Sequence, residues 1–331
     1  MTHFPPPPPL PPKVGPFRRV PPAVFPAILG LLGLIMAWKI AEQFLPFIVG
    51  PFVDIAEGMM TLLFLFFVAS YAVKFVIRPG SSIEDVNTLP GRTGLAAMAL
   101  GFFVLANLFA PRSFRFAAVF LGLGACLLLA IALYVAFHRL RGTDQAGPPT
   151  PSMHLVFVGF IVIPGSALPL GVPVTLVEML SLYCLVAALV VVAVTIKPLI
   201  TGAGTPPLRP LQGIQLAPPA FLTSACVMTG HSTLATVALV WASAVALLLL
   251  LRMRWLTEGG FSGFWSAFTF PVTAFAGALL LYGQMSGLDI LRILGGMVLL
   301  AATFYIPVIA YRILKLWAKG VLAVKTNASI A

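Results

Sequence analysis

The side chains that could carry proton or metal chemistry are few in this sequence. Its nine carboxylates are Glu42, Asp54, Glu57, Glu84, Asp85, Asp144, Glu178, Glu258 and Asp289. Only Glu178 and His154 stand close to the inside of an apolar stretch, and we expect both near a membrane surface, paired with a basic neighbour or a lipid headgroup. No nucleophile stands beside a base, and Cys126, Cys184 and Cys226 lack metal-ligand spacing. The sequence therefore predicts no enzyme activity, no metal site and no cofactor.

Proline is the residue whose spacing carries more information. Pro164, Pro218 and Pro271 lie inside apolar stretches at intervals of 54 and 53 residues, which hints at a repeated helix-pair unit. Pro26 and Pro219 lie in similar stretches. Because proline bends a helix and frees a backbone carbonyl, that carbonyl must face protein or a water-filled cavity when it lies at membrane depth. We therefore expect the proline-containing segments to face inward.

Hydrophobic segments long enough to cross a bilayer must position these residues. The 331 residues are 60% hydrophobic and 9% charged, with a mean hydropathy of +1.04, whereas roughly a quarter of the residues of a soluble protein are charged. A membrane-spanning helix needs about 20 mostly apolar residues. Ten segments meet this need, at residues 22–40, 53–77, 93–110, 115–137, 153–171, 174–196, 211–229, 232–252, 263–283 and 290–314. The sequence predicts an all-α membrane protein of about ten transmembrane helices, arranged as five helical hairpins.

The odd-numbered segments differ in composition from the even-numbered ones. They hold most of the prolines, together with glycine, serine, threonine and phenylalanine, and they hold no carboxylate. We expect the odd segments to form an inner ring around a narrow pore and the even segments to form an outer ring facing lipid. A pore without an acidic ring does not attract cations, and hydroxyl donors in a weakly positive protein tolerate anions. In the alternative interpretation, the prolines only shape a packed bundle.

Lys and Arg residues stand mainly at the ends of the apolar segments rather than on one polar face. Sixteen of the twenty fall in the N-terminal tail, the even-numbered loops or the C-terminus, and only Lys39, Arg112, Arg115 and Arg292 fall in odd-numbered loops. Positively charged loops stay on the cytoplasmic side. We therefore predict both termini in the cytoplasm of a cell with a bacterial-type inner membrane. The net charge of +11 reflects this orientation, and we expect no nucleic-acid partner.

Three regions follow from this pattern. Residues 1–20 are rich in proline and predict a disordered cytosolic tail, for which a docking or gating role is the alternative. Residues 21–318 form the ten-helix domain, and residues 319–331 form a short cytosolic C-terminal tail.

Four stretches resemble a known family of membrane proteins. They are FPAILGLLGLIMAW at 25–38, GIQLAPPAFLTSA at 213–225, WSAFTFPVT at 265–273 and, more loosely, residues 151–171. Each is similar to its counterpart in the tellurite-resistance and C4-dicarboxylate transporter family, which includes the plant slow-type anion channels. The resemblance covers nearly the whole chain after the proline-rich tail, and the stretch at 265–273 is its most specific part.

The resemblance implies a homotrimer in which each protomer has its own pore, walled by the odd-numbered helices. It also implies a pore gate, a phenylalanine of the ninth segment, and Phe270 is the residue at that position. With the glycine, proline and threonine pattern above, the candidate pore-lining or helix-bending residues are Phe25, Pro26, Gly30, Gly94, Gly101, Pro164, Pro218, Pro219, Thr223, Thr269 and Pro271.

Three functions remain open at this point. The first is a gated passive channel for small anions such as chloride and nitrate, with a phenylalanine plug. The second is a secondary transporter or efflux protein for C4-dicarboxylate, sulfite or tellurite-type anions. The third is a structural or sensory scaffold that uses the proline-rich tail for docking.

Overall fold

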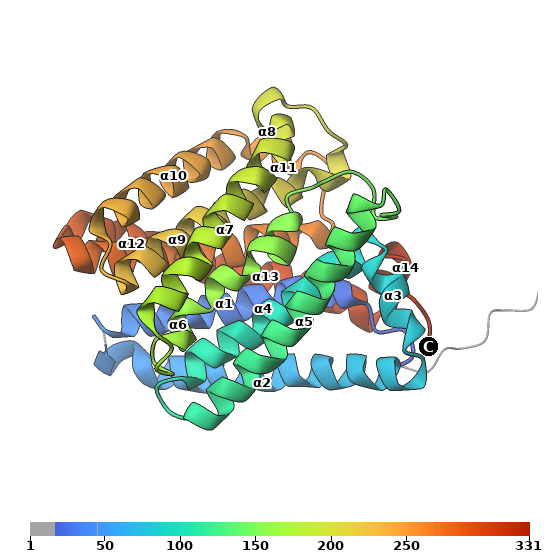
Figure 1. Cartoon of the computed structure of the whole chain (residues 1–331), viewed down its shortest axis with the longest axis horizontal. Helices are drawn as coiled ribbons and strands as arrows, with labels where there is room; N and C mark the ends of the chain where they lie inside the picture. Colours follow the sequence, from blue (N-terminus) through green and yellow to red (C-terminus); the bar gives the residue numbers. More distant parts are fainter. Residues whose placement is uncertain (1–16, 45) are drawn as a thin grey trace, which may run out of the picture.

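A computed structural model describes residues 17–44 and 46–331, and the described residues contain helices and no strand (Figure 1). Most of the predicted N-terminal tail therefore lies outside the described residues. Within the described part, eight helical segments are long and apolar enough to cross a membrane. They are α1 (Phe25–Glu42) with the preceding turn η1 (Pro22–Val24), α2 (Pro46–Ile77), α4 (Leu89–Phe109), α5 (Phe114–Leu140), α7 (Val174–Thr195), α10 (Ser232–Leu251), α12 (Phe270–Ser286) with the preceding turn η5 (Gly263–Phe268), and α13 (Asp289–Ala318).

The other two predicted segments are broken rather than regular. Residues 153–171 form a π-helical turn, η2 (His154–Val158), a 3-10 turn, η3 (Gly159–Val162), and one α-helical turn, α6 (Pro164–Ala167). Residues 211–229 form the end of a 3-10 stretch, η4 (Pro206–Leu216), followed by α9 (Ala217–Met228). Both segments are therefore helical, but neither is one continuous helix, because proline interrupts the backbone hydrogen bonding of each.

Prolines of the inner segments begin α-helices rather than bend them from within. All but Pro169, which lies in the turn after α6, stand in the first turn of a helix: Pro26 in α1, Pro90 in α4, Pro164 in α6, Pro218 and Pro219 in α9, and Pro271 in α12. The first helical turn has backbone N–H groups without an intrahelical acceptor, so proline loses nothing there. A 3-10 turn precedes α1, α6, α9 and α12 along the chain. These four segments therefore change helix type within the bundle.

Burial divides the long helices into two groups. The apolar windows of α1, α4 and the η5–α12 segment are 72%, 89% and 72% buried, whereas those of α2, α5, α7, α10 and α13 are 22–33% buried. The buried group belongs to the odd-numbered segments of the sequence. Helix α1 packs against α4 and α12, α12 packs against α9, and residues 154–167 contact both α4 and α9. The less buried helices expose large apolar side chains, such as Phe52, Leu140 and Phe304, which suits contact with lipid.

Short helices connect or follow the long ones. They are α3 (Gly80–Val86), α8 (Lys197–Thr201), α11 (Met253–Thr257) and α14 (Val321–Lys325). Next to α3, the side chains of Lys74 and Asp85 form a fully buried ion pair with Nζ and Oδ2 2.7 Å apart. Asp85 also accepts a hydrogen bond from the Tyr71 hydroxyl at 2.9 Å. This pair fixes α3 to the end of α2.

Gly94 lets the chain before α1 cross α4 in direct contact. A Cβ atom at Gly94 would lie 2.1 Å from the carbonyl oxygen of Pro22, which is a backbone atom and cannot rotate away. Replacing Gly94 with alanine should therefore force the two segments apart and destabilise the fold by about 1–3 kcal/mol. The expected result is a lower midpoint of thermal unfolding in detergent.

The matched control is Gly122→Ala on α5, where an added Cβ would meet nothing within 4 Å. Alanine is the better helix former, so this variant should unfold at the same temperature as the wild type or slightly above it. Equal midpoints for Gly94→Ala and Gly122→Ala would contradict the steric argument.

Candidate functional site

Two cavities follow one another along the buried helices. The N-side cavity, of about 310 Å³, is lined by the N-terminal turns of α1, α4, α9 and α12 and by residues 154–162. The C-side cavity, of about 430 Å³, is lined by later turns of α1, α4 and α9 and by the loop after α4. Lining residues of the N-side cavity include Ala23, Pro26, Pro90, Thr93, Pro218 and Pro271. Those of the C-side cavity include Met36, Lys39, Asn107, Arg112, Ser224 and Met228.

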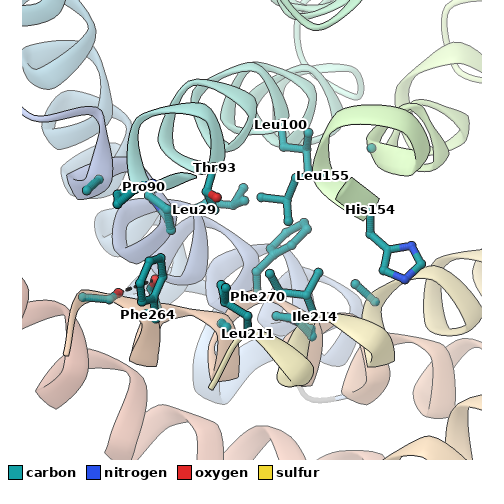
Figure 2. Close-up of a pocket in the computed structure, with 18 of the residues that line it drawn as sticks. Leu29, Pro90, Thr93, Leu100, His154, Leu155, Leu211, Ile214, Phe264 and Phe270 are labelled. Atoms are coloured by element: carbon teal, nitrogen blue, oxygen red, sulfur yellow. Dashed lines mark hydrogen bonds between the residues drawn. The ribbon is translucent and has the colours of Figure 1, made fainter. Parts of the chain in front are cut away.

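An apolar partition separates the two cavities. Phe221, Ile161 and Val162 line both cavities, and Phe270 lines the N-side cavity beside them. The rings of Phe221 and Phe270 have centroids 5.3 Å apart and planes at 32°. Figure 2 shows the Phe270 ring at the centre of the N-side cavity, pointing toward Leu155. We call Phe221, Phe270, Ile161 and Val162 the partition.

The backbone just before Phe270 is held on two sides. Thr269 lies between η5 and α12, and its hydroxyl donates a hydrogen bond to the Ser266 carbonyl at 2.7 Å. From α13, the Tyr305 hydroxyl donates to the Phe268 carbonyl at 2.9 Å. These two hydrogen bonds fix the backbone at the start of α12. The backbone that carries the Phe270 side chain is therefore held in place.

Glycines of α1 allow this backbone and the Phe270 ring to approach closely. A Cβ at Gly30 would lie 2.1 Å from Thr269 Oγ1, and a Cβ at Gly33 would lie 2.5 Å from Phe270 Cδ2. Helix α1 therefore forms the floor on which the Phe270 ring rests.

The predicted site residues fall into two groups by position. Phe270, Pro26, Pro218 and Pro271 line the N-side cavity, and Pro164 lines the C-side cavity. The others line neither cavity and lie at helix contacts: Phe25, Gly30, Gly94, Gly101, Pro219, Thr223 and Thr269. Phe25, for example, packs edge-on against Phe64 and Tyr71. Small or apolar residues of the buried helices thus form helix–helix contacts at least as often as they line a cavity.

A buried polar chain lies beside the N-side cavity. The Nε2 atom of His154 is 2.8 Å from Gln215 Oε1, and Gln215 Nε2 donates to Thr195 Oγ1 at 2.8 Å. Because Thr195 donates its own hydroxyl hydrogen to the Val191 carbonyl at 2.6 Å, its oxygen accepts from Gln215. The Gln215 carbonyl is then left to accept from His154, so Nε2 carries the hydrogen.

The expected partner of His154, a basic neighbour or a lipid headgroup, is wrong. The residue is 3% exposed and lines the N-side cavity, and its partner is an uncharged amide. Glu178 contacts a basic neighbour, as predicted, with Oε1 2.7 Å from His231 Nε2. The surroundings of His154 could not be predicted from the sequence, because its hydrogen-bond partner, Gln215, lies 61 residues away.

Charged side chains surround the C-side cavity. Lys39 and Arg112 line it, and Asp54 contacts both, at 2.6 Å from Lys39 Nζ and 2.8 Å from Arg112 Nη2. Glu42 pairs with Lys39, and Glu57 pairs with Arg112. Burial lowers the pKa of the Arg112 guanidinium, but the hydrogen bond that it donates to Glu57 and the charges of Glu57 and Asp54 raise the pKa overall. Arg112 therefore stays charged at this cavity.

A family model described as voltage-dependent anion channel matches residues 19–314, which include all ten apolar segments. The chain belongs to this family. A comparison with curated proteins gives no match. Membership in the voltage-dependent anion channel family confirms the relationship that the four sequence stretches indicated. It implies that the protein carries anions across a membrane, as a channel or a transporter, and the eight long apolar helices agree with an integral membrane protein.

Residues 19–314, which the family model matches, supply every lining residue of the C-side cavity and most lining residues of the N-side cavity. Leu316, Leu322, Lys325 and Thr326 also line the N-side cavity but follow the last matched residue, 314.

Proposed function

We propose that the protein is a gated passive channel for small anions such as chloride and nitrate, with Phe270 as the plug. The observation that carries this proposal is the pair of cavities separated only by the partition. Displacing the Phe270 ring would leave only Phe221, Ile161 and Val162 between the two cavities, and side-chain movement of these three would join spaces that together follow the buried helices. An ion could then pass by diffusion, because no further rearrangement of the backbone would be needed.

In this proposal the five buried segments enclose the pore and the five less buried helices face lipid. The contacts of α1 with α4 and α12, of α12 with α9, and of residues 154–167 with α4 and α9 support such a ring. We further propose a homotrimer with one pore in each protomer, placed in a bacterial-type inner membrane with both termini cytoplasmic, as the family resemblance and the Lys/Arg distribution suggest.

Three features favour anions over cations. Among the described residues, no carboxylate lines either cavity. Lys39 and Arg112 line the C-side cavity. The N-side cavity is lined by the first turns of α1, α4, α9 and α12, and the aligned peptide dipoles of a helix give its N-terminus a partial positive charge. An anion in the N-side cavity would therefore meet a positive potential. At the C-side cavity, Lys39 and Arg112 offer hydrogen-bond donors whose charges are offset by Glu42, Asp54 and Glu57.

The partition offers a passing ion no fixed charge and no hydrogen-bond donor from its side chains, because its four residues are apolar. An anion crossing it must give up part of its hydration. Selectivity should then follow dehydration cost, so we expect nitrate to permeate better than chloride. Reversal potentials under bi-ionic conditions, measured in reconstituted bilayers, test this order. A clear preference for chloride would contradict a pore with an apolar constriction.

The alternative function is a secondary transporter or efflux protein for C4-dicarboxylate, sulfite or tellurite-type anions. The His154–Gln215–Thr195 chain favours it, because a buried histidine beside a cavity could exchange a proton with a substrate. Uptake of malate or sulfite into proteoliposomes that saturates and depends on a proton gradient would support this function. A linear current–voltage response without saturation would support the channel.

A further inference from the structure

The chain after α13 turns back under the N-side cavity. Helix α13 ends at Ala318, Gly320 adopts a positive φ of 69°, and α14 runs from Val321 to Lys325 in the returning direction. Leu322 is 1% exposed and lines the N-side cavity together with Lys325 and Thr326. Residues 319–331, which we call the C-terminal segment, therefore form one edge of this cavity.

Hydrogen bonds fix the C-terminal segment to three other parts of the chain. The Ser329 N–H donates to Asp85 Oδ1 at 3.0 Å, and the Ser329 hydroxyl donates to the Ser81 carbonyl at 2.9 Å. The Arg78 Nη1 group donates to the Ile330 carbonyl at 2.6 Å. The Ala331 N–H donates to the Arg18 carbonyl at 2.8 Å. The end of the C-terminal segment therefore lies against α3 (Figure 1).

The acceptor of the Ser329 N–H is itself held rigidly. Asp85 uses its other oxygen for the buried bonds with Lys74 and Tyr71. The segment is thus attached to the most buried charged group at this end of the bundle. Because these bonds hold the C-terminal segment, its residues keep their position relative to the N-side cavity.

Lys325 is the only side chain with a permanent charge among the described residues that line the N-side cavity. Its side chain is exposed, so it stands where the cavity opens to solvent. No carboxylate within the described residues forms a salt bridge with it. The charge of its ammonium group therefore acts on the entrance without neutralisation.

We propose that the C-terminal segment forms a fixed rim of the N-side entrance, on which Lys325 is a specificity-determining residue for anions. The proposal rests on the channel function proposed above and deepens it. The Lys325 ammonium group raises the anion concentration at the entrance and lowers the cation concentration there. Because the family match ends at residue 314, this property belongs to the chain itself rather than to the matched region.

The test uses the Phe270→Ala channel, in which the plug is removed and the entrance can limit the current. Lys325→Gln and Lys325→Glu are compared in this background, in about 10 mM and about 1 M salt, where charges are screened over roughly 30 Å and 3 Å. Reversing the charge of Lys325 should reduce anion current about two- to five-fold in low salt and hardly at all in high salt.

Lys319→Glu is the matched control. Lys319 is an exposed lysine of the same segment that does not line the cavity, so its replacement changes the net charge equally. It should leave the low-salt current nearly unchanged. A Lys325→Cys variant, made with the exposed Cys126 replaced by serine, adds a control for folding, because thiol reagents then give one folded protein a positive or a negative charge at position 325. The positive reagent should raise the low-salt current and the negative reagent should lower it.

The outcomes separate the two proposals. If Phe270→Ala itself passes no anion current, the channel function fails. If Phe270→Ala conducts but Lys325→Glu and Lys319→Glu behave alike in low salt, the channel stands and the role of Lys325 is overturned. A reduction by Lys325→Glu that persists equally in 1 M salt would also overturn it, since a screened charge cannot cause that effect.

Discussion

Phe270→Ala should raise the anion current by at least about tenfold over the wild type. A tenfold change corresponds to a barrier lower by about 1.4 kcal/mol. Burying a phenylalanine side chain contributes about 1.5–3 kcal/mol, and opening by displacement of Phe270 must give up part of this free energy. The ring stacks on Phe221 and rests on Gly33 of α1, so its removal leaves the two cavities separated only by the remaining side chains of the partition. Single-channel and macroscopic currents in reconstituted bilayers measure the effect.

Phe25→Ala is the control for this prediction. Phe25 is as deeply buried as Phe270 but packs against Phe64 and Tyr71 and lines neither cavity. It should destabilise the protein without raising the current. If neither wild type nor Phe270→Ala conducts, while both take up substrate with saturation and pH dependence, the transporter function replaces the channel.

Asp85→Ala should destabilise the protein by about 3–5 kcal/mol, because it leaves a buried ammonium group without its counter-charge. Lys74 has no exposed side-chain surface, and the Val20 carbonyl at 3.2 Å would be its remaining acceptor. The Tyr71 hydroxyl and the Ser329 N–H would lose their acceptor as well. Thermal unfolding in detergent should show a strongly lowered midpoint. Trypsin should cleave after Lys325 faster, because the C-terminal segment is released.

Two further variants test whether the loss of stability depends on burial of the Lys74–Asp85 ion pair. Glu84→Ala removes the neighbouring carboxylate, which pairs with Arg78 on the surface with both side chains 48% exposed, and should cost about 0–1 kcal/mol. The double variant Lys74→Met/Asp85→Leu replaces the buried pair by apolar groups and should lose much less stability than Asp85→Ala. Similar losses for Glu84→Ala and Asp85→Ala would show that burial of the pair does not matter.

Hydropathy alone predicts much of this fold, because a helix that crosses the hydrocarbon core of a bilayer must be long, apolar and free of charge near its middle. Eight of the ten segments are found within a few residues of their predicted limits, for example 174–195 where 174–196 was expected. The two exceptions share a cause. A 3-10 or π turn next to proline has the same apolar composition as an α-helix, so composition does not reveal the change of helix type at residues 154–163 and 206–216.

The candidate site is less predictable than the fold. Gly30 and Gly94 were reasonable pore-lining candidates, yet their missing side chains admit Thr269 and the Pro22 carbonyl. Sequence cannot distinguish a glycine that faces a cavity from one that faces a helix. Phe221 lies in the family-like stretch at 213–225, but nothing there singles it out among 26 phenylalanines, and Phe270 was found only through the family motif. Lys325 was missed because an exposed lysine near the end of a chain has no pattern to mark it.

Two of the less buried helices are much longer than a bilayer is thick. Helices α2 and α13 have 32 and 30 residues, so each extends about 45–48 Å at 1.5 Å per residue, against a hydrocarbon core of about 30 Å. They must tilt or stand out of the membrane, and the balance between the two depends on bilayer thickness. Helix α13 carries Tyr305, which holds the backbone in front of Phe270. The thickness of the host membrane thereby acts on the same helix that holds the backbone of the proposed plug, and membranes of different acyl-chain length would hold this helix differently.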